Sequence, residues 1–322
     1  MAYSKEKSEQ IFNMVRDIGV DAAAKKLGIT RESVRRGARA HKKQASKSEP
    51  MFNDNVMRQI RERFSDKELR QMASGSMAKV DTMTARHSFE GDEINFGLIT
   101  DTHLGSKYTK VSRLYSAFDK CDELGVDFIA HCGDVHEGLS HRPDHMYQCT
   151  HLGYEAQLAH SREVFSQWTN SPIYMIDGNH DRWFIKSAGA YIVKELCSTQ
   201  DNLKFIGHDE GDIKLKGCPV TIKLWHGEDG SSYAYSYRVQ KLVESFTGGE
   251  KPNVLLTGHT HKAFYLPNCR HVECVSAGAI QSQSAWMRSK KHANHTGFWT
   301  VKMLVDKKGV VSFTPTWYPF YE

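Results

Sequence analysis

Residues 99–105 read ITDTHLG, and in them a carboxylate and an imidazole follow directly on an apolar run. The preceding stretch INFGL, at 94–98, has the length and composition of a buried strand. Asp101 and His103 alternate along the chain, so in an extended segment both side chains point to one side. The end of this strand is therefore a candidate functional site.

Four further motifs repeat this arrangement, each after a short apolar strand and beside a glycine. They are GD at 133–134, GNHD at 178–181, HG at 226–227 and GHTH at 258–261. Helix-like segments lie between the strands, at 111–124, 151–170 and 233–246, and strand-like runs fill 263–317. The alternation predicts an α/β fold, and ligands of α/β sheets bind at the C-terminal ends of strands.

The motifs offer the donor atoms of a transition-metal site. Imidazole together with carboxylate suits zinc, iron, manganese or nickel better than calcium. A single D-x-H or H-x-H pattern occurs by chance in many chains, and a lone histidine more often has a structural role. Five motifs in one order, each directly after an apolar strand, indicate one shared site.

With these motifs the sequence resembles the calcineurin-like metallophosphoesterase family from about Ile94 to Tyr318. The resemblance implies a two-sheet sandwich flanked by helices, holding two divalent metal ions. One ion would be held by Asp101, His103, Asp134 and His261, and the other by Asp134, Asn179, His226 and His259. Asp134 would bridge the two ions. We expect manganese, although iron, zinc and nickel also accept these ligands.

The resemblance also implies a mechanism. Two cations ~3.5–4 Å apart clamp a phosphoryl group and lower the pKa of a bridging water, which attacks phosphorus as hydroxide. His180 resembles the family's non-ligand histidine, and we expect it to stabilise or protonate the leaving oxygen. Asp181 would either orient His180 or serve as a turn or cap residue.

The first motif is similar to the D-x-H-L-G of nuclease subunits in double-strand-break repair complexes. Those nucleases carry a histidine at the position of Glu137, and in this chain a histidine, His136, comes one residue earlier. We expect His136 to contact substrate. We also expect Arg288 and Lys290, in a polar loop after GHTH, to grip substrate phosphates, with Trp286 near enough to stack on a base. An ordinary solvated loop is the other interpretation.

The basic charge of the chain is concentrated at its N-terminus. The net charge of the 322 residues is +5. Residues 1–50 hold twelve Lys and Arg against six Asp and Glu, a net charge of +6, so the remaining 272 residues carry −1. This partition indicates an anionic partner for the N-terminal segment, or a solvated basic helical face.

Residues 5–43 predict three short helices that resemble a helix-turn-helix. Gly28 is expected to end the second helix and Thr30 to cap the third. The third helix would present Arg31, Arg35, Arg36, Arg39, Lys42 and Lys43 to DNA phosphates and base edges. The alternative is an assembly module that supports a homo-oligomer. A helix-turn-helix joined to such a phosphoesterase is similar to proteins encoded by bacteriophages.

These features predict three regions. Residues 1–45 form the DNA-binding module, 46–92 a linker with a helical segment near 54–74, and 93–322 the metallophosphoesterase domain. No apolar run approaches the ~20 residues of a membrane span, and the polar N-terminus lacks a secretory signal. The seven cysteines contain no C-x-x-C pair. We therefore expect a cytoplasmic protein without a disulfide framework or membrane partner.

The expected activity is hydrolysis of phosphodiester bonds in DNA. The alternative is a phosphatase or small-nucleotide phosphodiesterase whose N-terminal helices serve in assembly. A DNA-binding protein with an inactive phosphoesterase fold is disfavoured, because no ligand position of the motifs is lost.

Overall fold

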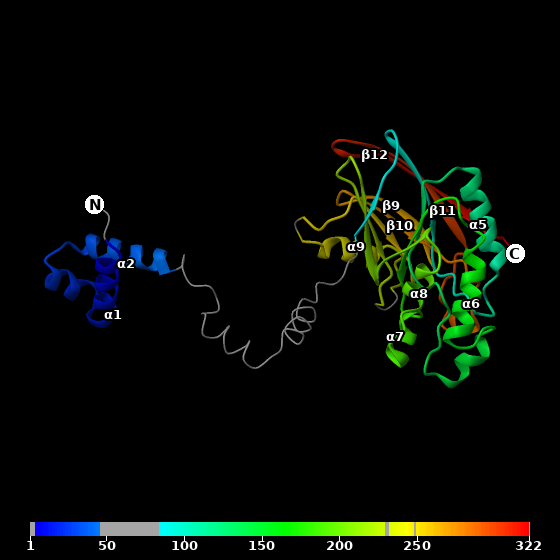
Figure 1. Ribbon diagram of the computed structural model, residues 1–322, viewed down its shortest axis with the longest axis horizontal. Coiled ribbons are helices and arrows are strands. Elements are labelled where there is room, and N and C mark those ends of the chain that lie inside the picture. Colours follow the sequence, from blue (N-terminus) through cyan, green and yellow to red (C-terminus); the bar gives the residue numbers. More distant parts are fainter. Residues whose placement is uncertain (1–3, 46–83, 229–231, 248, 322) are drawn as a thin grey trace. The chain divides into compact units, whose positions relative to one another are not determined.

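The computed structural model of this chain describes residues 4–45, 84–228, 232–247 and 249–321. The chain divides into two compact units, Met1–Ala78 and Lys79–Glu322. Figure 1 shows helices α1 and α2 in the smaller unit and all the labelled strands in the larger one. The helical segment predicted near 54–74 lies outside the described residues.

The smaller unit contains α1 (Lys5–Leu27) and α2 (Arg31–Ala45). Gly19, with φ 80° and ψ 168°, interrupts the helical backbone of α1, so the unit has three helical segments as predicted. Gly28 ends α1 in the left-handed conformation, and its backbone N–H bonds to the Ala24 carbonyl. The Thr30 hydroxyl accepts a 3.2 Å hydrogen bond from the Ser33 N–H, which confirms the predicted cap.

A small apolar core joins these helices. Ile11, Ala23 and Val34 are fully buried in it. Gly37 allows α1 and α2 to approach closely, because a Cβ at this position would lie 2.8 Å from the Ile11 Cδ1 atom. Gly37 thus permits close packing of the two helices.

The larger unit is a sandwich of two mixed sheets flanked by helices, as the sequence predicts (Figure 1). The strands of the first sheet are, in spatial order, β12 (Gly309–Pro319), β11 (Gly297–Asp306), β2 (Glu93–Ile99), β3 (Phe128–His131), β4 (Ile173–Asp177) and β5 (Leu203–His208). Those of the second are β1 (Thr84–His87), β6 (Glu210–Leu215), β7 (Thr221–Trp225), β8 (Val254–Thr257), β10 (Val272–Ala277) and β9 (Ala263–Cys269).

Helices flank the two sheets. They are α5 (Val111–Glu123), α6 (Tyr154–Phe165), α7 (Arg182–Ala188), α8 (Ile192–Ser198), α9 (Tyr237–Ser245) and α10 (Ala285–Ser289), with a 3₁₀ helix, η1, at Pro143–Gln148. Residues of α5, α6 and α8 pack on the first sheet in one apolar cluster. Val239 and Val243 of α9 pack on β8 and β10 of the second sheet.

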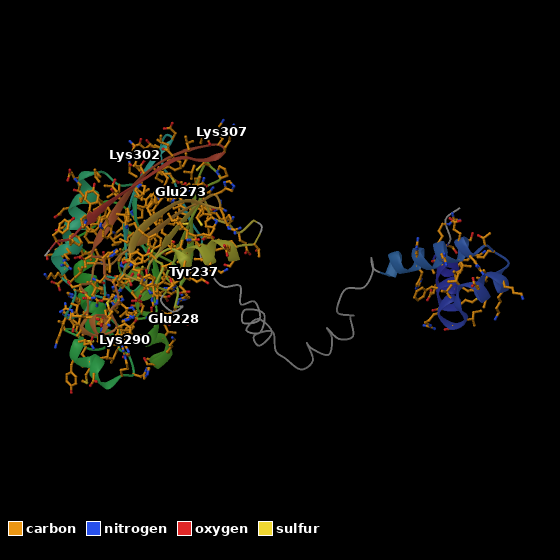
Figure 2. All side chains as sticks on the ribbon, turned by 180° about the vertical axis from the view of Figure 1, so that it is seen from behind. Glu228, Tyr237, Glu273, Lys290, Lys302 and Lys307 are labelled. Atoms are coloured by element: carbon orange, nitrogen blue, oxygen red, sulfur yellow. The ribbon has the colours of Figure 1, made fainter. Side chains whose placement is uncertain are left out.

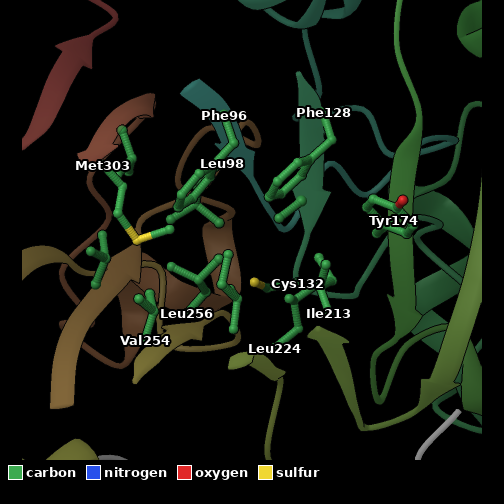
Figure 3. Packing of buried hydrophobic residues seen from close by; sticks show 14 of the residues in the cluster. Phe96, Leu98, Phe128, Cys132, Tyr174, Ile213, Leu224, Val254, Leu256 and Met303 are labelled. Carbon is green, nitrogen blue, oxygen red and sulfur yellow. The ribbon is translucent and has the colours of Figure 1, made fainter. Parts of the chain in front are cut away.

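The main core lies between the sheets. Alternate residues of each strand point into it, including Phe96 and Leu98 from the first sheet and Leu224 and Leu256 from the second. Figure 3 shows these side chains meeting across the interface. Because parallel strands β2, β3 and β4 are buried on both faces, their sequences read as nearly continuous apolar runs.

The five strands predicted before the motifs are β2, β3, β4, β7 and β8. Three strands were not expected, namely β5, β6 and β1, of which β1 lies N-terminal to the predicted domain boundary at 93 and pairs in parallel with β6. The folded body therefore begins by Thr84, and the other predicted boundaries stay predictions. All seven cysteines are free thiols. No helix among the described residues is long and apolar enough to cross a membrane.

Replacing Phe128 with alanine tests the sandwich core. Its ring stacks on that of Phe96 with centroids 5.0 Å apart, and both side chains are fully buried. We expect Phe128→Ala to lower the free energy of unfolding by about 3–5 kcal/mol in denaturant titrations. Val311→Ala, on an edge strand with Val311 63% exposed, should change it by less than about 0.5 kcal/mol. Equal small effects of the two changes would contradict this description of the core.

Candidate metal centre

All five motifs meet at one end of the sandwich. Three follow β2, β3 and β4 of the first sheet, and two follow β7 and β8 of the second. The first two motifs run side by side, since the Asp101 N–H bonds to the Gly133 carbonyl and the His103 N–H to the Asp134 carbonyl, each at 3.0 Å. Both sheets therefore contribute polar side chains to one buried centre.

The first cluster of donor atoms surrounds Asp101. His261 Nε2 lies 3.1 Å and His103 Nε2 3.7 Å from Asp101 Oδ1. His103 Nε2 also lies 3.6 Å from Asp134 Oδ2. These are the four residues that the sequence assigns to one ion.

The second cluster lies on the other side of Asp134. His226 Nε2 is 3.3 Å from Asp134 Oδ2 and 3.1 Å from the Asn179 side-chain oxygen. His259 belongs to the same cluster, and its ring centroid lies 5.1 Å from that of His226. Asp134 Oδ2 thus lies next to imidazoles of both clusters, which is the position expected of a bridging ligand.

The backbone is strained where these side chains converge. Five non-glycine residues with the predicted ligand side chains have positive φ: Asp101 (50°), His103 (44°), Asp134 (50°), His259 (70°) and His261 (54°). Each such conformation costs of order 1–3 kcal/mol and persists only where the surroundings enforce it. The strained turns aim consecutive side chains into the centre instead of letting the strands continue.

Glycines in the motifs make room for the carboxylates. A Cβ on Gly178 would collide with the Asp134 carboxylate and its backbone N–H. A Cβ on Gly258 would collide with the Thr100 hydroxyl and lie 2.6 Å from the Cys132 carbonyl. The GNHD and GHTH turns therefore need glycine for close approach to the first two motifs.

Three of the histidines are held by their Nδ1 atoms, which leaves Nε2 facing the centre. The partners are the Glu137 carboxylate for His103 at 3.0 Å, the Cys132 carbonyl for His226 at 2.7 Å and the Asn294 side-chain oxygen for His261 at 2.7 Å. Hydrogen bonds of this kind fix ring orientation and tautomer in metal sites.

The electrostatics of the centre favour added positive charge. Burial alone would raise the pKa of the Asp134 carboxyl, but the imidazoles of His226 and His180 hold it below its usual range. Burial would lower the pKa of His226, yet Asp134 raises it to about 9. Among the described residues, Asp101 Oδ1 and His103 Nε2 are buried without a hydrogen-bond partner. A cation between these atoms would satisfy both of them.

His180 lies beside the clusters. Its N–H bonds to Asp134 Oδ1 and its Nδ1 donates to the Glu137 carbonyl, both at 2.8 Å. The ring packs on Trp183 with centroids 3.9 Å apart. Burial lowers the pKa of the imidazole. With Nδ1 engaged, Nε2 is the nitrogen that remains for a reacting group.

The expected catalytic contact of Asp181 with His180 is wrong. The Asp181 carboxylate accepts hydrogen bonds from the N–H groups of Val135, His136 and Gly178 at 2.9–3.0 Å. It therefore ties the GNHD turn to the second motif, which is the turn role that the sequence also allowed.

The expected substrate contact of His136 is also wrong, because its side chain is engaged within the protein. Its imidazole is fully buried, with Nδ1 2.9 Å from the Asp181 carboxylate and Nε2 2.9 Å from the Ser161 hydroxyl of α6. The next residue, Glu137, faces the centre instead. Neighbouring residues of an extended segment point to opposite sides, which explains the exchange.

A cleft of about 420 Å³ opens over the metal centre. Its walls include Arg142, Lys262, Trp286 and Met287. Arg288 and Lys290 are exposed on or beside α10 and are not among the lining residues, so their expected grip on substrate phosphates stays a prediction. The short helix turns Trp286 and Met287 toward the cleft in their place.

The arginines of the N-terminal unit lie on α2. Arg31, Arg35, Arg36 and Arg39 are exposed. Arg31 forms an ion pair with Asp21 at 2.5 Å. Lys42 and Lys43 continue α2, but their side chains lie outside the described part of the chain.

Sequence reasoning missed the residues that support the ligands. Glu137 contacts His103, His145 at 3.0 Å and Gln281 at 3.1 Å. Its place three residues after Asp134 was a signal, because the nucleases that the first motif resembles carry histidine there. Gln281 and Asn294 lie in a polar run without any comparable pattern.

The family model described as the calcineurin-like phosphoesterase superfamily domain matches residues 94–293. The chain belongs to this superfamily. The matched range contains all five motifs and both donor clusters. The clusters fit two divalent metal ions, as this superfamily membership implies.

Solved structures align with most of the larger unit at low identity. A Vps29 mutant from Entamoeba histolytica is 12% identical, with 70% of this chain and 99% of that chain covered and a TM-score of 0.38. The phosphoesterase Yfce from E. coli is 16% identical, with 69% and 98% covered and a TM-score of 0.36. A dimetal phosphatase from Danio rerio is 10% identical, with 70% and 99% covered and a TM-score of 0.36. No curated protein matches the chain.

Glu137 offers a test of ligand support in this metallophosphoesterase. Removing its carboxylate frees the His103 ring, so Glu137→Ala should weaken metal binding by about 10–100-fold. Calorimetric titration of the metal-free protein with Mn²⁺ measures this change. Glu123→Ala, which removes an exposed carboxylate paired with Lys120, serves as the control. Equal affinities in the two variants would contradict the role of Glu137.

Proposed function

We propose that the chain is a nuclease that hydrolyses phosphodiester bonds of DNA with two divalent transition-metal ions, manganese first among them. The supporting observation is the position of Asp134 Oδ2, which lies 3.6 Å from His103 Nε2 and 3.3 Å from His226 Nε2 beneath an open cleft. The two ions would be held by the predicted sets of ligands on either side of Asp134.

When bound, a pair of such ions neutralises phosphoryl oxygens and supplies a nucleophile from water at neutral pH. The protein's own residues position the substrate and handle the proton of the leaving group. Arg142 and Lys262 line the cleft and can neutralise phosphates next to the scissile one. Thr260 and Asn179 also face the cleft and offer polar contacts to the sugar or phosphate.

His180 assists the leaving oxygen in this proposal. Its Nδ1–H is donated to the Glu137 carbonyl, which fixes the ring. The protonated imidazole then gives the Nε2 proton to the departing alkoxide. Burial lowers the pKa of His180, which makes its protonated form a stronger acid and a less populated one.

DNA is the preferred substrate class because the basic charge lies in the first 50 residues, while the rest of the chain carries −1. Exposed Arg35, Arg36 and Arg39 on one helix suit phosphates and base edges. The N-terminal unit would recruit DNA and the cleft would cut it, in the host cytoplasm if the bacteriophage-type layout holds. A phosphatase or small-nucleotide phosphodiesterase predicts instead that these arginines do not affect turnover of DNA.

Measuring metal binding and turnover separately tests the role of His180. His180→Ala leaves every proposed metal ligand in place, so the variant should retain its metal. Its turnover of DNA should fall by about 10²–10⁴-fold, the loss expected for a general acid. Metal content and steady-state kinetics, measured on one preparation, give both quantities. Asp134→Ala is the matched comparison and should lose metal and turnover together. A His180 variant with empty sites would overturn the assignment.

The salt dependence of DNA binding tests recruitment. Each phosphate contact adds about 0.9 to the slope of log affinity against log salt. The triple change Arg35→Ala, Arg36→Ala and Arg39→Ala in the whole chain should therefore reduce that slope by up to about 2.7. Fluorescence anisotropy in chelator, which prevents cutting, measures the affinity.

A control variant loses the same three positive charges from the larger unit instead of the N-terminal unit. Lys120→Ala, Arg162→Ala and Lys241→Ala remove three exposed or half-buried cations of the larger unit that pair with local carboxylates. This variant should keep the original slope. If both triple variants give one slope, the N-terminal helices do not recruit DNA.

A further inference from the structure

Two exposed aromatic side chains are paired with cations of the cleft wall. The exposed large aromatics among the described residues are Tyr147, Tyr191, Tyr233, Tyr235, Tyr237, Trp286 and Tyr321. Four of these seven lie in the short segments 233–237 and 285–289, which adjoin residues of the cleft wall. Tyr237, which begins α9, and Lys290, just after α10, are labelled in Figure 2.

The first aromatic group pairs Trp286 with Arg142. Both side chains line the cleft, and the guanidinium lies over the indole ring, 5.7 Å from its centroid. The ring of His292, also in the cleft wall, is 5.5 Å from Trp286. Trp286 nevertheless remains 45% exposed. A cation and an open aromatic surface therefore stand together in the wall.

The second group pairs Tyr235 with Lys262. The Lys262 ammonium lies 4.8 Å from the ring centroid and donates to the Ser232 carbonyl at 3.0 Å. Lys262 lines the cleft and directly follows the proposed ligand His261. Tyr235 itself does not line the cleft and lies beside its wall, where it is 44% exposed and its ring centroid is 5.6 Å from that of His295. This pair is thus tied to the metal centre through the backbone of the GHTH motif.

Each pair has the two components that bind one nucleotide of a single strand. A base stacks on the aromatic ring, at about 1–3 kcal/mol per base, while the cation neutralises the adjoining phosphate. In a duplex the base faces are covered by neighbouring base pairs, so they cannot reach these rings. The pairing of cation and aromatic side chain therefore favours an unpaired strand.

We infer that the cleft takes an unpaired DNA strand, with one base stacked on Trp286 beside Arg142 and another on Tyr235 beside Lys262. The inference rests on the proposed function and names its substrate form. Base faces are common to all sequences, so recognition at these rings depends on the presence of a base and little on its identity.

The test uses tetranucleotides with the whole, metal-loaded protein. One substrate carries all its bases, a second carries abasic sugars at the two central positions, and a third is the same sequence within a hairpin duplex. We expect kcat/KM for the complete strand to exceed that of the other two by at least about tenfold, the value of one stacked base. Equal values for all three substrates would overturn the inference.

Variants test whether the advantage of the complete strand depends on the rings of Trp286 and Tyr235. Trp286→Ala should raise KM for the complete strand by about tenfold or more and reduce the advantage over the abasic strand. Trp286→Phe, which keeps an aromatic face, should restore most of that advantage. Tyr321→Ala removes an aromatic side chain that is not in the cleft wall and should retain all the original values. An advantage that survives Trp286→Ala and Tyr235→Ala together would contradict the assignment.

Photochemical cross-linking gives a readout that is independent of turnover. A tetranucleotide with 5-iodouracil at a central position is irradiated together with the protein in the presence of a chelator, which prevents cutting. The linked peptides are then identified by mass spectrometry. Links to Trp286 or Tyr235 are expected, and links only to other residues would overturn the inference.

Hydrolysis of bis(4-nitrophenyl) phosphate by the unaltered protein separates the two proposals. If it is hydrolysed while base removal has no effect, only the single-strand inference fails, whereas inertness toward every phosphodiester rejects both.

Discussion

The burial of Asp101 and Asp134 is the constraint on which the larger unit depends. Their carboxylates are 0% and 2% exposed, and isolated buried carboxylates are costly. Neighbouring imidazoles and backbone N–H groups offset part of that cost, as the lowered pKa of each carboxyl reflects. Two divalent cations would offset more. The donor atoms are therefore brought together at a cost in free energy, which comes from buried carboxylates and strained backbone.

The surrounding elements enforce that arrangement. Strained turns aim the side chains inward, and Gly178 leaves space beside Asp134. The Asp181 carboxylate holds two of these turns together through three backbone N–H groups. Glu137 then links a ligand histidine to the cleft wall. The sandwich core provides the rigid base, since strands from both sheets end at the same place and each cluster draws residues from both sheets, so a shift of either sheet would pull both clusters apart.

Local signals in the sequence predicted much of this structure. The apolar runs before the motifs identified five strands, and Gly28 and Thr30 identified the ends of helices, because caps and buried strands depend on residues close in the chain. Side-chain direction was less predictable. His136 and Glu137 are neighbours, and only the pairing of Leu104 with His136 decides which one faces the centre. Strand β1 was missed because its partner β6 lies more than 120 residues away. Of the polar loop after GHTH, Trp286 lines the cleft and Arg288 does not, a difference set by the short helix α10 that the sequence pattern did not predict.

The central claim is that this chain holds two metal ions that share Asp134. Anomalous diffraction from crystals of the whole protein loaded with Mn²⁺, together with elemental analysis of the same preparation, measures the number and position of the ions. The account predicts two ions per chain, one beside Asp101 and one beside His226, with Asp134 in contact with both. A single ion, or two ions that do not share Asp134, would contradict it.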